Sequence, residues 1–456
     1  MWIPGISTGG MGRRHFMKHM AGFSLMAAPS IGFVSGLRAM QEKLKKDHKS
    51  LIVLWMSGGP SHMDTWDMKP GESTGGEFKP IKTSANGVMI SEHLPTVAKQ
   101  MKHLSIIRSL VTNEGSHDRG TQLMHTAYQP NPAITFPSIG AVTSQQIAPK
   151  ELAIPSFISV SRPAEGPGFL GMTYAPFNVQ NPGSPPDNIS LPGDLGDERS
   201  KLIRGDFRRK FLANVENSFA AQSRGVAAGA HTDVYKKAFD LTYSQLKNVF
   251  DLKIDGNKPM DAKYEEMYGN DAFGRGCLLA RKLVEAGVTC VEVGLGGWDN
   301  HANIFQALHN SNNGNATPGK TAPAMNRGGG LLDRLDKGMG ALVQDLVERG
   351  LWKNTVVVWM GEFGRTPKIN QNGGRDHWAR CWSVVVGGGG IKGGIVHGST
   401  DKDGMSVKDN PATVGDLFAT LYSALGISPD VEIRDPLGRP RKISGEKAGK
   451  PISSLI

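Results

Sequence analysis

The chain has 456 residues, of which 39% are hydrophobic, and a formal net charge of +10. This length allows a large buried core, or more than one. Basic and acidic residues are interspersed, which argues against a nucleic-acid-binding surface and leaves a mild attraction for anionic substrates.

Residues 1–40 have the pattern of an export signal. The stretch Gly12 to Lys18 reads GRRHFMK and fits the twin-arginine motif of two arginines, any residue, an aromatic residue, an apolar residue and lysine. The apolar stretch that follows, from Met20 to about Val34, is too short and too interrupted by Gly and Pro for a stable membrane span. We therefore predict that the twin-arginine export machinery carries the folded protein to the periplasm, or otherwise exports it. A disordered basic tail is the alternative.

Three cysteines occur, at positions 277, 290 and 381. No Cys-x-x-Cys pair is present, so zinc ribbons and dithiol redox chemistry are not supported. A disulfide between Cys277 and Cys290 is an option in an oxidising compartment, but we predict buried thiols.

Strand and helix patterns alternate along the chain. Short apolar runs predict buried strands over residues 51–56, 104–110, 156–161, 288–293, 355–360 and 381–386, with an edge strand at 395–398. Helical patterns cover residues 95–103, 122–127, 274–286, 331–351 and 413–425, with a helical insertion at about 198–252 that covers one side of the sheet. This alternation predicts one α/β domain over residues 45–456, in which helices cover both faces of a mainly parallel sheet.

Polar residues follow the first two strands directly. After strand 51–56, His62 and Asp64 are candidate metal ligands, although a turn with Asp64 as a helix cap would look the same. After strand 104–110, Ser116, His117 and Thr121 precede a helix, whose amino terminus favours anions. Ordinary helix capping is the alternative there.

Two later strands end in the same way. Asp299 and His301 follow strand 288–293, and a larger polar group follows strand 355–360. Carboxylates and imidazoles are metal ligands, and guanidinium groups clamp anions. Because ligands bind outside the carboxyl ends of strands in open α/β sheets, these groups predict one site at one sheet edge. Exposed ion pairs are the alternative. The group after strand 355–360 comprises Glu362, Arg365, Arg375, Asp376 and His377.

The segments GGPSHMDTWD (58–67), GWDNH (297–301), GEFGRTP (361–367) and GRDHW (374–378) resemble an exported bacterial "domain of unknown function" family. That family is placed in the alkaline phosphatase and sulfatase superfamily. The resemblance covers roughly residue 45 to the end. It implies an alkaline-phosphatase-like fold and a hydrolase of phosphate or sulfate esters with one or two divalent ions per chain, such as zinc, calcium or manganese.

The resemblance also implies roles for the candidate residues. Asp64 (or His62) matches the metal-binding acid after the first strand, and Asp299 and His301 resemble the Asp/His pair of one metal site. Glu362 stands where the superfamily often has Asp-His, and Asp376 and His377 resemble the position of the final ligand. A metal would polarise the ester oxygens, while Arg365 and Arg375 would neutralise charge on the transferred group.

The chain departs from the sulfatase pattern at the nucleophile. The Cys/Ser-x-Pro-x-Arg motif, whose first residue becomes formylglycine, is absent, and His117 is nearest its position. The nucleophile is then Ser116, Thr121 or a bound water, or it is missing.

Function therefore has three interpretations. The first is an exported metal-dependent hydrolase that acts on esters of small molecules or glycans. A glycan could stack on the rings of Trp66, Trp298 or Trp378, although these rings could instead pack around the site. The second is a non-catalytic binding or scaffold protein that keeps the fold. The third is a transferase of the cell envelope that uses the same residues.

Overall fold

The central strand of the protein forms where the sequence has its first uninterrupted apolar run. Residues 51–56 are all buried, and such a run can only be accommodated in a strand covered on both faces. The computed structural model describes residues 48–149, 152–186, 189, 197–220, 237–253, 260–309 and 329–456, and residues 48–456 group as one unit. The predicted export signal lies outside the described residues.

Eight strands of the described residues form the main sheet, in the order β12-β4-β11-β8-β1-β7-β5-β6. All seven predicted strands are present, and β6 is an addition within a segment that reads as loop. The strands are β1 (Ser50–Ser57), β4 (Leu104–Leu110), β5 (Phe157–Val160), β6 (Phe177–Val179), β7 (Cys290–Gly296), β8 (Thr355–Met360), β11 (Trp382–Gly388) and β12 (Val396–His397).

Parallel pairing dominates this sheet, as predicted. β1 pairs in parallel with both β7 and β8, with Leu51 opposite Cys290 on one side and Val356 on the other. Within the described sheet, β11 alone runs antiparallel to its neighbours β4 and β8. The chain therefore leaves β8 and enters β11 at the same edge of the sheet, so the whole connection from 361 to 381 stays at that edge.

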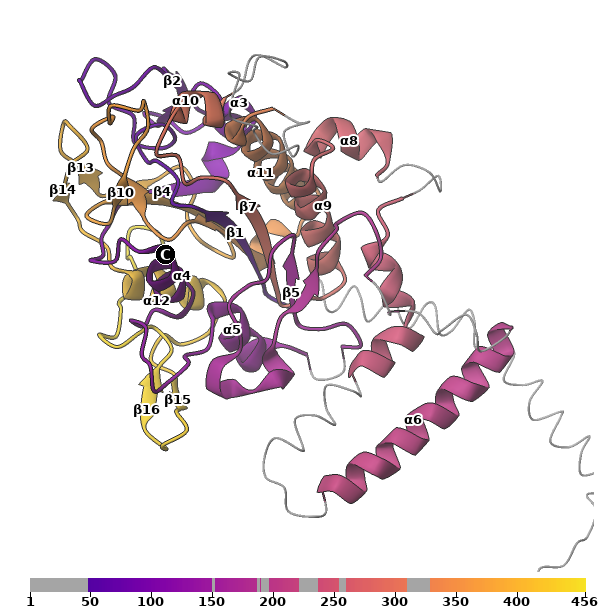
Figure 1. Ribbon diagram of the computed structural model, residues 1–456. Helices are drawn as coiled ribbons and strands as arrows, with labels where there is room; N and C mark the ends of the chain where they lie inside the picture. Colours follow the sequence, from indigo (N-terminus) through magenta and orange to yellow (C-terminus); the bar gives the residue numbers. More distant parts are fainter. Residues whose placement is uncertain are drawn as a thin grey trace, which may run out of the picture. The chain divides into compact units, whose positions relative to one another are not determined.

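Alternate residues of β1 supply two separate cores, one on each face of the sheet. Ile52, Leu54 and Met56 belong to the first core, and Leu51, Val53 and Trp55 to the second. The first core includes residues of α9 (Ala272–Glu285), α11 (Leu331–Glu348) and α3 (Pro95–Gln100). The second includes residues of α4 (His117–Thr126), α5 (Ile139–Ile147) and α12 (Val414–Ala424). Helices thus cover both faces, and the predicted α/β architecture is confirmed (Figure 1).

Shorter elements complete the described part. The small strands are β2 (Pro80–Lys82), β3 (Met89–Ser91), β9 (Gly364–Arg365), β10 (His377–Trp378), β13 (Ser399–Thr400), β14 (Val407–Asp409), β15 (Glu432–Arg434) and β16 (Pro440–Lys442). The further helices are α6 (Glu198–Ala220), α8 (Ala262–Tyr268) and α10 (Ile304–Leu308), and the 3-10 helices are η1 (Met101–His103), η2 (Gly168–Leu170), η3 (Met172–Tyr174), η5 (Gln245–Phe250) and η6 (Trp352–Asn354).

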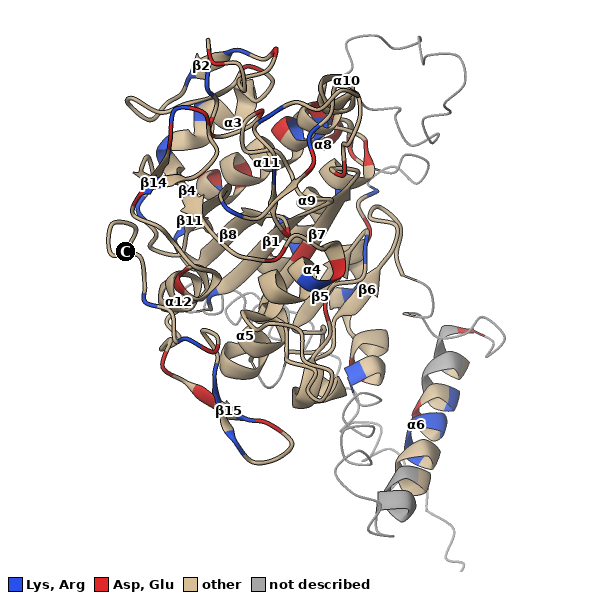
Figure 2. Cartoon of the chain, turned by 60° about the vertical axis from the view of Figure 1, so that its left-hand side comes forward, with Lys and Arg blue, Asp and Glu red and all other residues tan. Residues whose placement is uncertain are grey.

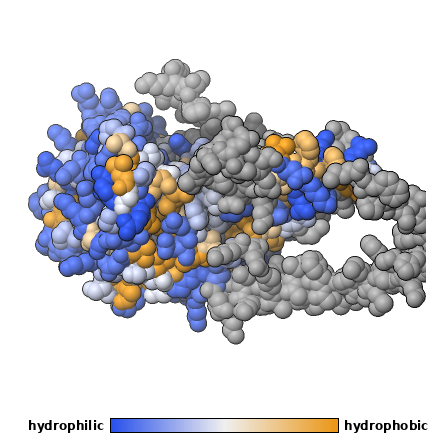
Figure 3. Space-filling view, turned by 90° about the horizontal axis from the view of Figure 1, so that it is seen from below, coloured by the Kyte–Doolittle hydropathy of each residue, from blue (hydrophilic) through white to orange (hydrophobic). Residues whose placement is uncertain are grey.

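The predicted insertion at 198–252 is helical where the structure describes it, in α6, at residues 237–243 and in η5. Residues 221–236 of the prediction lie outside the described residues. α6 exposes large apolar side chains at intervals of four residues, namely Ile203, Phe207, Phe211 and Val215. Hydrophobic side chains are also seen among hydrophilic ones on the surface shown in Figure 3.

All three cysteines are buried thiols, so the predicted free state is confirmed and the alternative of a Cys277–Cys290 disulfide is wrong. Among the described residues, no helix combines the length and apolar character needed to span a bilayer.

Candidate metal centre

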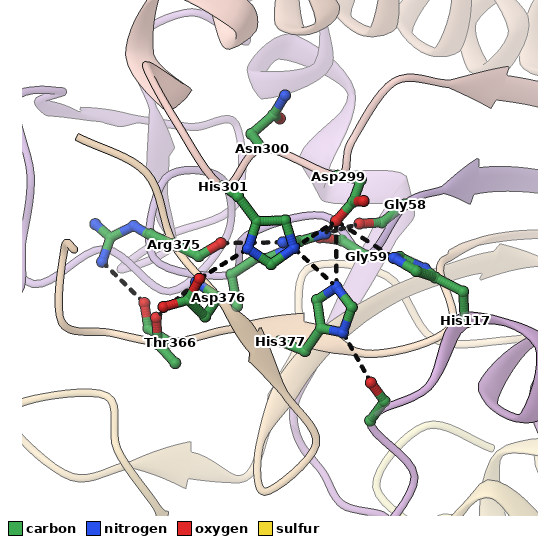
Figure 4. Close-up of polar contacts among 12 residues, drawn as sticks. Gly58, Gly59, His117, Asp299, Asn300, His301, Thr366, Arg375, Asp376 and His377 are labelled. Atoms are coloured by element: carbon green, nitrogen blue, oxygen red, sulfur yellow. Dashed lines mark hydrogen bonds and ion pairs between the residues drawn. The ribbon is translucent and has the colours of Figure 1, made fainter. Parts of the chain in front are cut away.

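Four side chains from three distant segments meet at the carboxyl edge of the sheet (Figure 4). His117 begins α4, Asp299 and His301 follow β7, and His377 lies in β10. Asp299 Oδ1 lies 3.3 Å from His117 Nε2, 3.0 Å from His301 Nε2 and 3.2 Å from His377 Nε2. Among the described residues, the ligand atoms of His117, Asp299 and His377 all lie within 4.8 Å of one another, a spacing that could hold a metal ion.

Glycine and strand pairing bring these segments together. The loop after β1 packs so closely on the loop after β7 that a Cβ at Gly58, whose φ is +118°, would lie 2.4 Å from Asp299 N. β10 pairs antiparallel with β9, which places His377 opposite Arg365. The sequence therefore folds the end of β8 back over the end of β7, and His377 reaches Asp299.

Each of the three imidazoles is held through its Nδ1 atom. His377 Nδ1 donates to the Gly115 carbonyl at 2.8 Å, and a carbonyl can only accept. His301 Nδ1 donates to Asp376 Oδ1 at 2.7 Å. A hydrogen on Nδ1 leaves a lone pair on Nε2 of the neutral ring, which is the tautomer that binds metals.

His117 is fixed in the same way by a buried carboxylate. Its Nδ1 donates to Glu362 Oε1 at 2.6 Å, and the same oxygen accepts from Gly58 N at 2.8 Å. Three Nε2 atoms therefore lie around one carboxylate oxygen, and His301 Nε2 and His377 Nε2 are only 3.1 Å apart. Neutral rings with hydrogen on Nδ1 would direct their Nε2 lone pairs at Asp299 Oδ1, and a cation placed among these atoms would remove the repulsion, so the residues fit a bound metal ion.

Asp299 is kept ionised by a buried arginine behind it. Partial burial disfavours its charge, but the hydrogen bond and the positive charge of Arg365 outweigh burial and hold the pKa of Asp299 well below its usual range. Arg365 also donates to the carbonyls of Gly58, Gly59 and Arg375. Its side chain is fully buried, so it positions Asp299 rather than facing an incoming anion.

Glu362 is a candidate for a further contact with the ion. Its side chain is almost fully buried, and its second oxygen, Oε2, has no hydrogen-bond partner among the described residues. Asp376 has a different place, because it contacts His301 Nδ1 and Asn370 rather than the Nε2 atoms. Hydrogen bonding from His301 lowers the pKa of Asp376. We therefore place Asp376 behind the ligands, where it orients His301.

The structure places His62, Asp64 and Arg375 outside this cluster. Asp64 and Arg375 form a fully buried ion pair, with distances of 2.7 and 3.0 Å from Oδ2 to Nε and from Oδ1 to Nη2. Arg375 also donates to the carbonyls of Thr74, Thr366 and Pro367. His62 is buried beside Gly404, and burial lowers its pKa. These contacts are structural, so we leave all three out of the proposed metal site.

A cavity of about 640 Å³ opens beside the cluster. Its walls come from the ends of β1 and β7, from one face of α4 and from the loop after β5. Figure 2 labels these four elements on the ribbon. Thr121 lies on the wall between His117 and His125, while Ser116 is not among the lining residues. The residues that line the cavity include His117, Thr121, His125, Arg162, Glu292, Asp299 and Glu362.

Two of the three tryptophans expected near the site are core residues. Trp66 and Trp298 are at most 1% exposed and each packs edge-on against Trp359. They cannot stack on a sugar. Trp378 is half-buried, with Arg380 over its ring and its indole nitrogen bonded to the Met405 carbonyl.

The wall of the cavity includes a buried ion pair that we did not predict from the sequence. His125 Nε2 lies 3.2 Å from Glu292 Oε2, and its Nδ1 donates to the Thr121 carbonyl at 2.8 Å. Burial disfavours the charged imidazole, but Glu292 outweighs burial and raises the pKa of His125. The signal in the sequence was the spacing of 117, 121 and 125, which places the three residues on one helix face.

This pair predicts a pH dependence of stability. Because the folded pKa of His125 is raised, its contribution is fully present below about pH 6.5, the usual unfolded pKa, and is lost as pH rises through the folded pKa. We expect the free energy of unfolding of wild type, relative to His125→Gln, to fall as pH rises from 6 to 9. Urea denaturation at a series of pH values measures it, and a difference that does not change with pH would contradict the assignment.

The fold and the cluster together define an α/β protein with a candidate metal centre at the carboxyl edge of its sheet. Across residues 48–456 the chain matches the family described as protein of unknown function (DUF1501). The chain belongs to that family, which confirms the resemblance to a domain-of-unknown-function family. No curated protein matches the chain in sequence.

Solved structures with some similarity include sulfatases and a member of the alkaline phosphatase superfamily. The PsFucS1 sulfatase from Pseudoalteromonas sp. is 12% identical, with 86% of this chain and 70% of that chain covered and a TM-score of 0.34. A protein in the alkaline phosphatase superfamily from Vibrio parahaemolyticus is 13% identical, with 89% and 70% covered and a TM-score of 0.34. The lipoteichoic acid synthase LtaP from Listeria monocytogenes is 9% identical, with 88% and 75% covered and a TM-score of 0.34.

Proposed function

We propose that this protein is an exported metal-dependent hydrolase of phosphate or sulfate esters. The observation that supports this most is the convergence of three imidazole Nε2 atoms on Asp299 Oδ1, each ring held by a hydrogen bond to its Nδ1 atom. Export rests on the twin-arginine pattern of the sequence.

The donor set favours one ion with an affinity for nitrogen. His117, His301, His377 and Asp299 would hold it, with Glu362 Oε2 as a further candidate. Imidazoles suit zinc or another transition metal, whereas calcium prefers a shell of oxygen atoms. Of the ions named from the sequence, zinc fits best and manganese next. When bound, the ion would supply Lewis-acid polarisation of an ester oxygen.

The residues around the ion have separate tasks. Asp376, Gly115 and Glu362 fix the three rings in the tautomer that exposes Nε2. Arg365 keeps Asp299 charged and in place. The cavity next to the cluster offers room for the substrate. Thr121, a candidate nucleophile from its place in the sequence, is one of the lining residues.

Turnover assays test this proposal. The zinc-loaded protein is expected to hydrolyse 4-nitrophenyl phosphate or 4-nitrophenyl sulfate. Treatment with a chelator, or the substitution His377→Ala, is expected to lower the rate of hydrolysis by roughly 100-fold or more. His397→Ala is the matched control, because His397 lies in the edge strand β12 and bonds to Ser454, outside the cluster. Stoichiometric metal without turnover of either ester would favour the binding or scaffold interpretation.

A further inference from the structure

We propose that Arg162 binds a second anionic group of the substrate, so that this site selects esters of multiply charged molecules. The inference rests on the proposed function, because it assumes that the first anionic group lies at the histidine cluster. Arg162 and the cluster residues His117 and Asp299 line the same cavity.

The turn after β5 fixes the start of the Arg162 side chain. Ser161 has a φ of +70°, which non-glycine residues seldom adopt and which is often retained at functional positions. Its amide donates to the Val179 carbonyl at 2.9 Å. Ser159 Oγ donates to the Arg162 carbonyl and accepts from Ala164 N. Pro163 further restricts the backbone of Arg162 to extended conformations. The backbone of Arg162 is thus held in one orientation.

Two glycines of β7 form the surface along which the arginine lies. A Cβ at Gly294 would lie 3.1 Å from Arg162 Cβ and Cγ, and a Cβ at Gly296 would lie 2.7 Å from Nη1. Both glycines have backbone angles that other residues accept, so close approach of Arg162 is the reason that fits their lack of side chains. Gly296 is three residues from Asp299, which limits the separation of their Cα atoms to about 11 Å.

Among the residues that the structure describes, no partner balances the charge of Arg162. Within the described ranges, its guanidinium has no hydrogen bond or ion pair, although the side chain borders a cavity that contains carboxylates. Among the carboxylates of this cavity, Glu292 pairs with His125 and Asp299 with Arg365. Glu165 lines the same cavity, and within the described ranges no hydrogen bond or ion pair joins it to Arg162. The guanidinium group of Arg162 therefore lines the cavity with its N–H donors available to an anion. Guanidinium groups bind oxyanions well because two of their N–H groups can donate in parallel.

The size of the cavity indicates a ligand larger than one ester group. At about 640 Å³ it falls in the range of pockets that enclose whole small molecules. A sugar-sized molecule with one phosphate or sulfate at the cluster could then place a second at Arg162. Both groups are tetrahedral oxyanions, so the same arginine would accept either.

The test compares matched ligands that differ by one anionic group. Binding of glucose 6-phosphate and glucose 1,6-bisphosphate to the zinc-loaded protein is measured by isothermal titration calorimetry, and so is binding of glucose 6-sulfate and glucose 3,6-disulfate. Wild type is expected to bind the doubly charged member of at least one pair roughly 10- to 100-fold more tightly, as a charge-assisted hydrogen bond predicts. Which pair shows the preference tells phosphate from sulfate.

Three variants distinguish a specific contact with Arg162 from the effect of overall positive charge on binding. Arg162→Gln is expected to bind both members of the pair alike. Gly296→Ala keeps the charge but displaces Nη1, and is expected to reduce the preference as well. Arg204→Gln removes a guanidinium from the exposed face of α6 and is expected to keep the wild-type preference.

Lack of any preference in wild type, or an undiminished preference in Arg162→Gln, would overturn the inference. Zinc content and ester turnover are measured on the same samples. If the protein has no zinc and no turnover but keeps an Arg162-dependent preference, the hydrolase proposal is wrong and the anion site at Arg162 is supported. If the protein is an active zinc enzyme without the preference, the hydrolase proposal is supported and the anion site is wrong.

Discussion

Asp299→Asn is expected to lose its metal while keeping its fold. Asp299 Oδ1 is the atom on which the three Nε2 atoms converge, and a neutral amide is a much weaker ligand. The side chain is 47% exposed, and asparagine still offers Arg365 an acceptor, so the structural cost is small. Elemental analysis after dialysis should show about one equivalent in wild type and background levels in the variant, with similar unfolding curves for the two metal-free proteins.

Two further substitutions serve as a control and as a milder change at the same site. Asp118→Asn changes an exposed acid on the rim of the same cavity, and the metal content should not change. Asp376→Asn weakens only the hold on His301, and substitutions of this kind typically lower metal affinity 10- to 100-fold. If Asp299→Asn binds metal as wild type does, the cluster is not the metal site.

Asp64→Ala is expected to have the largest effect on stability of the substitutions considered. The change leaves Arg375 without its carboxylate in a place where neither side chain is exposed. Removing one partner of such a pair typically costs about 3–5 kcal/mol of the free energy of unfolding. Urea denaturation measures this loss, and Asp206→Ala, which breaks an exposed pair on α6, is the control that should change little.

The same variant separates the two interpretations of Asp64. The sequence pattern predicts a metal ligand at Asp64, whereas in the structure both of its carboxylate oxygens accept hydrogen bonds from Arg375. An Asp64→Ala protein that keeps its stability but loses its metal would return Asp64 to the metal site. A strongly destabilised protein that still binds metal at low temperature would support the structural role.

The strands and their order along the chain could be predicted because the signal is local. Runs such as 355–360 are apolar on both faces, and only a central strand buries both. The rule that ligands lie beyond the carboxyl ends of strands placed Asp299, His301 and His377 at one sheet edge, where their side chains meet in the structure. The same rule, applied to strand 156–161, points to Arg162, which follows that strand and lines the same cavity.

Other features depend on contacts between distant residues. The sequence does not distinguish a carboxylate and a guanidinium that bind a ligand from two that pair with each other. The ion pair between Asp64 and Arg375 could therefore not be predicted. The start of α4 was expected at Gln122, but the helix begins at His117, and this earlier start brings His117 to the cluster. The reversed direction of β11 also has no local signal, because a buried strand has the same composition either way.

The proposed ligands come from three segments that are far apart in the chain, so binding of an ion to them would increase resistance to unfolding. An ion bound only by the native state stabilises it by about 2.7 kcal/mol when its free concentration is 100 times the dissociation constant. The midpoint of thermal unfolding should therefore climb steadily with zinc concentration. Such a titration would rank candidate ions, and the variants described above, without any knowledge of the substrate.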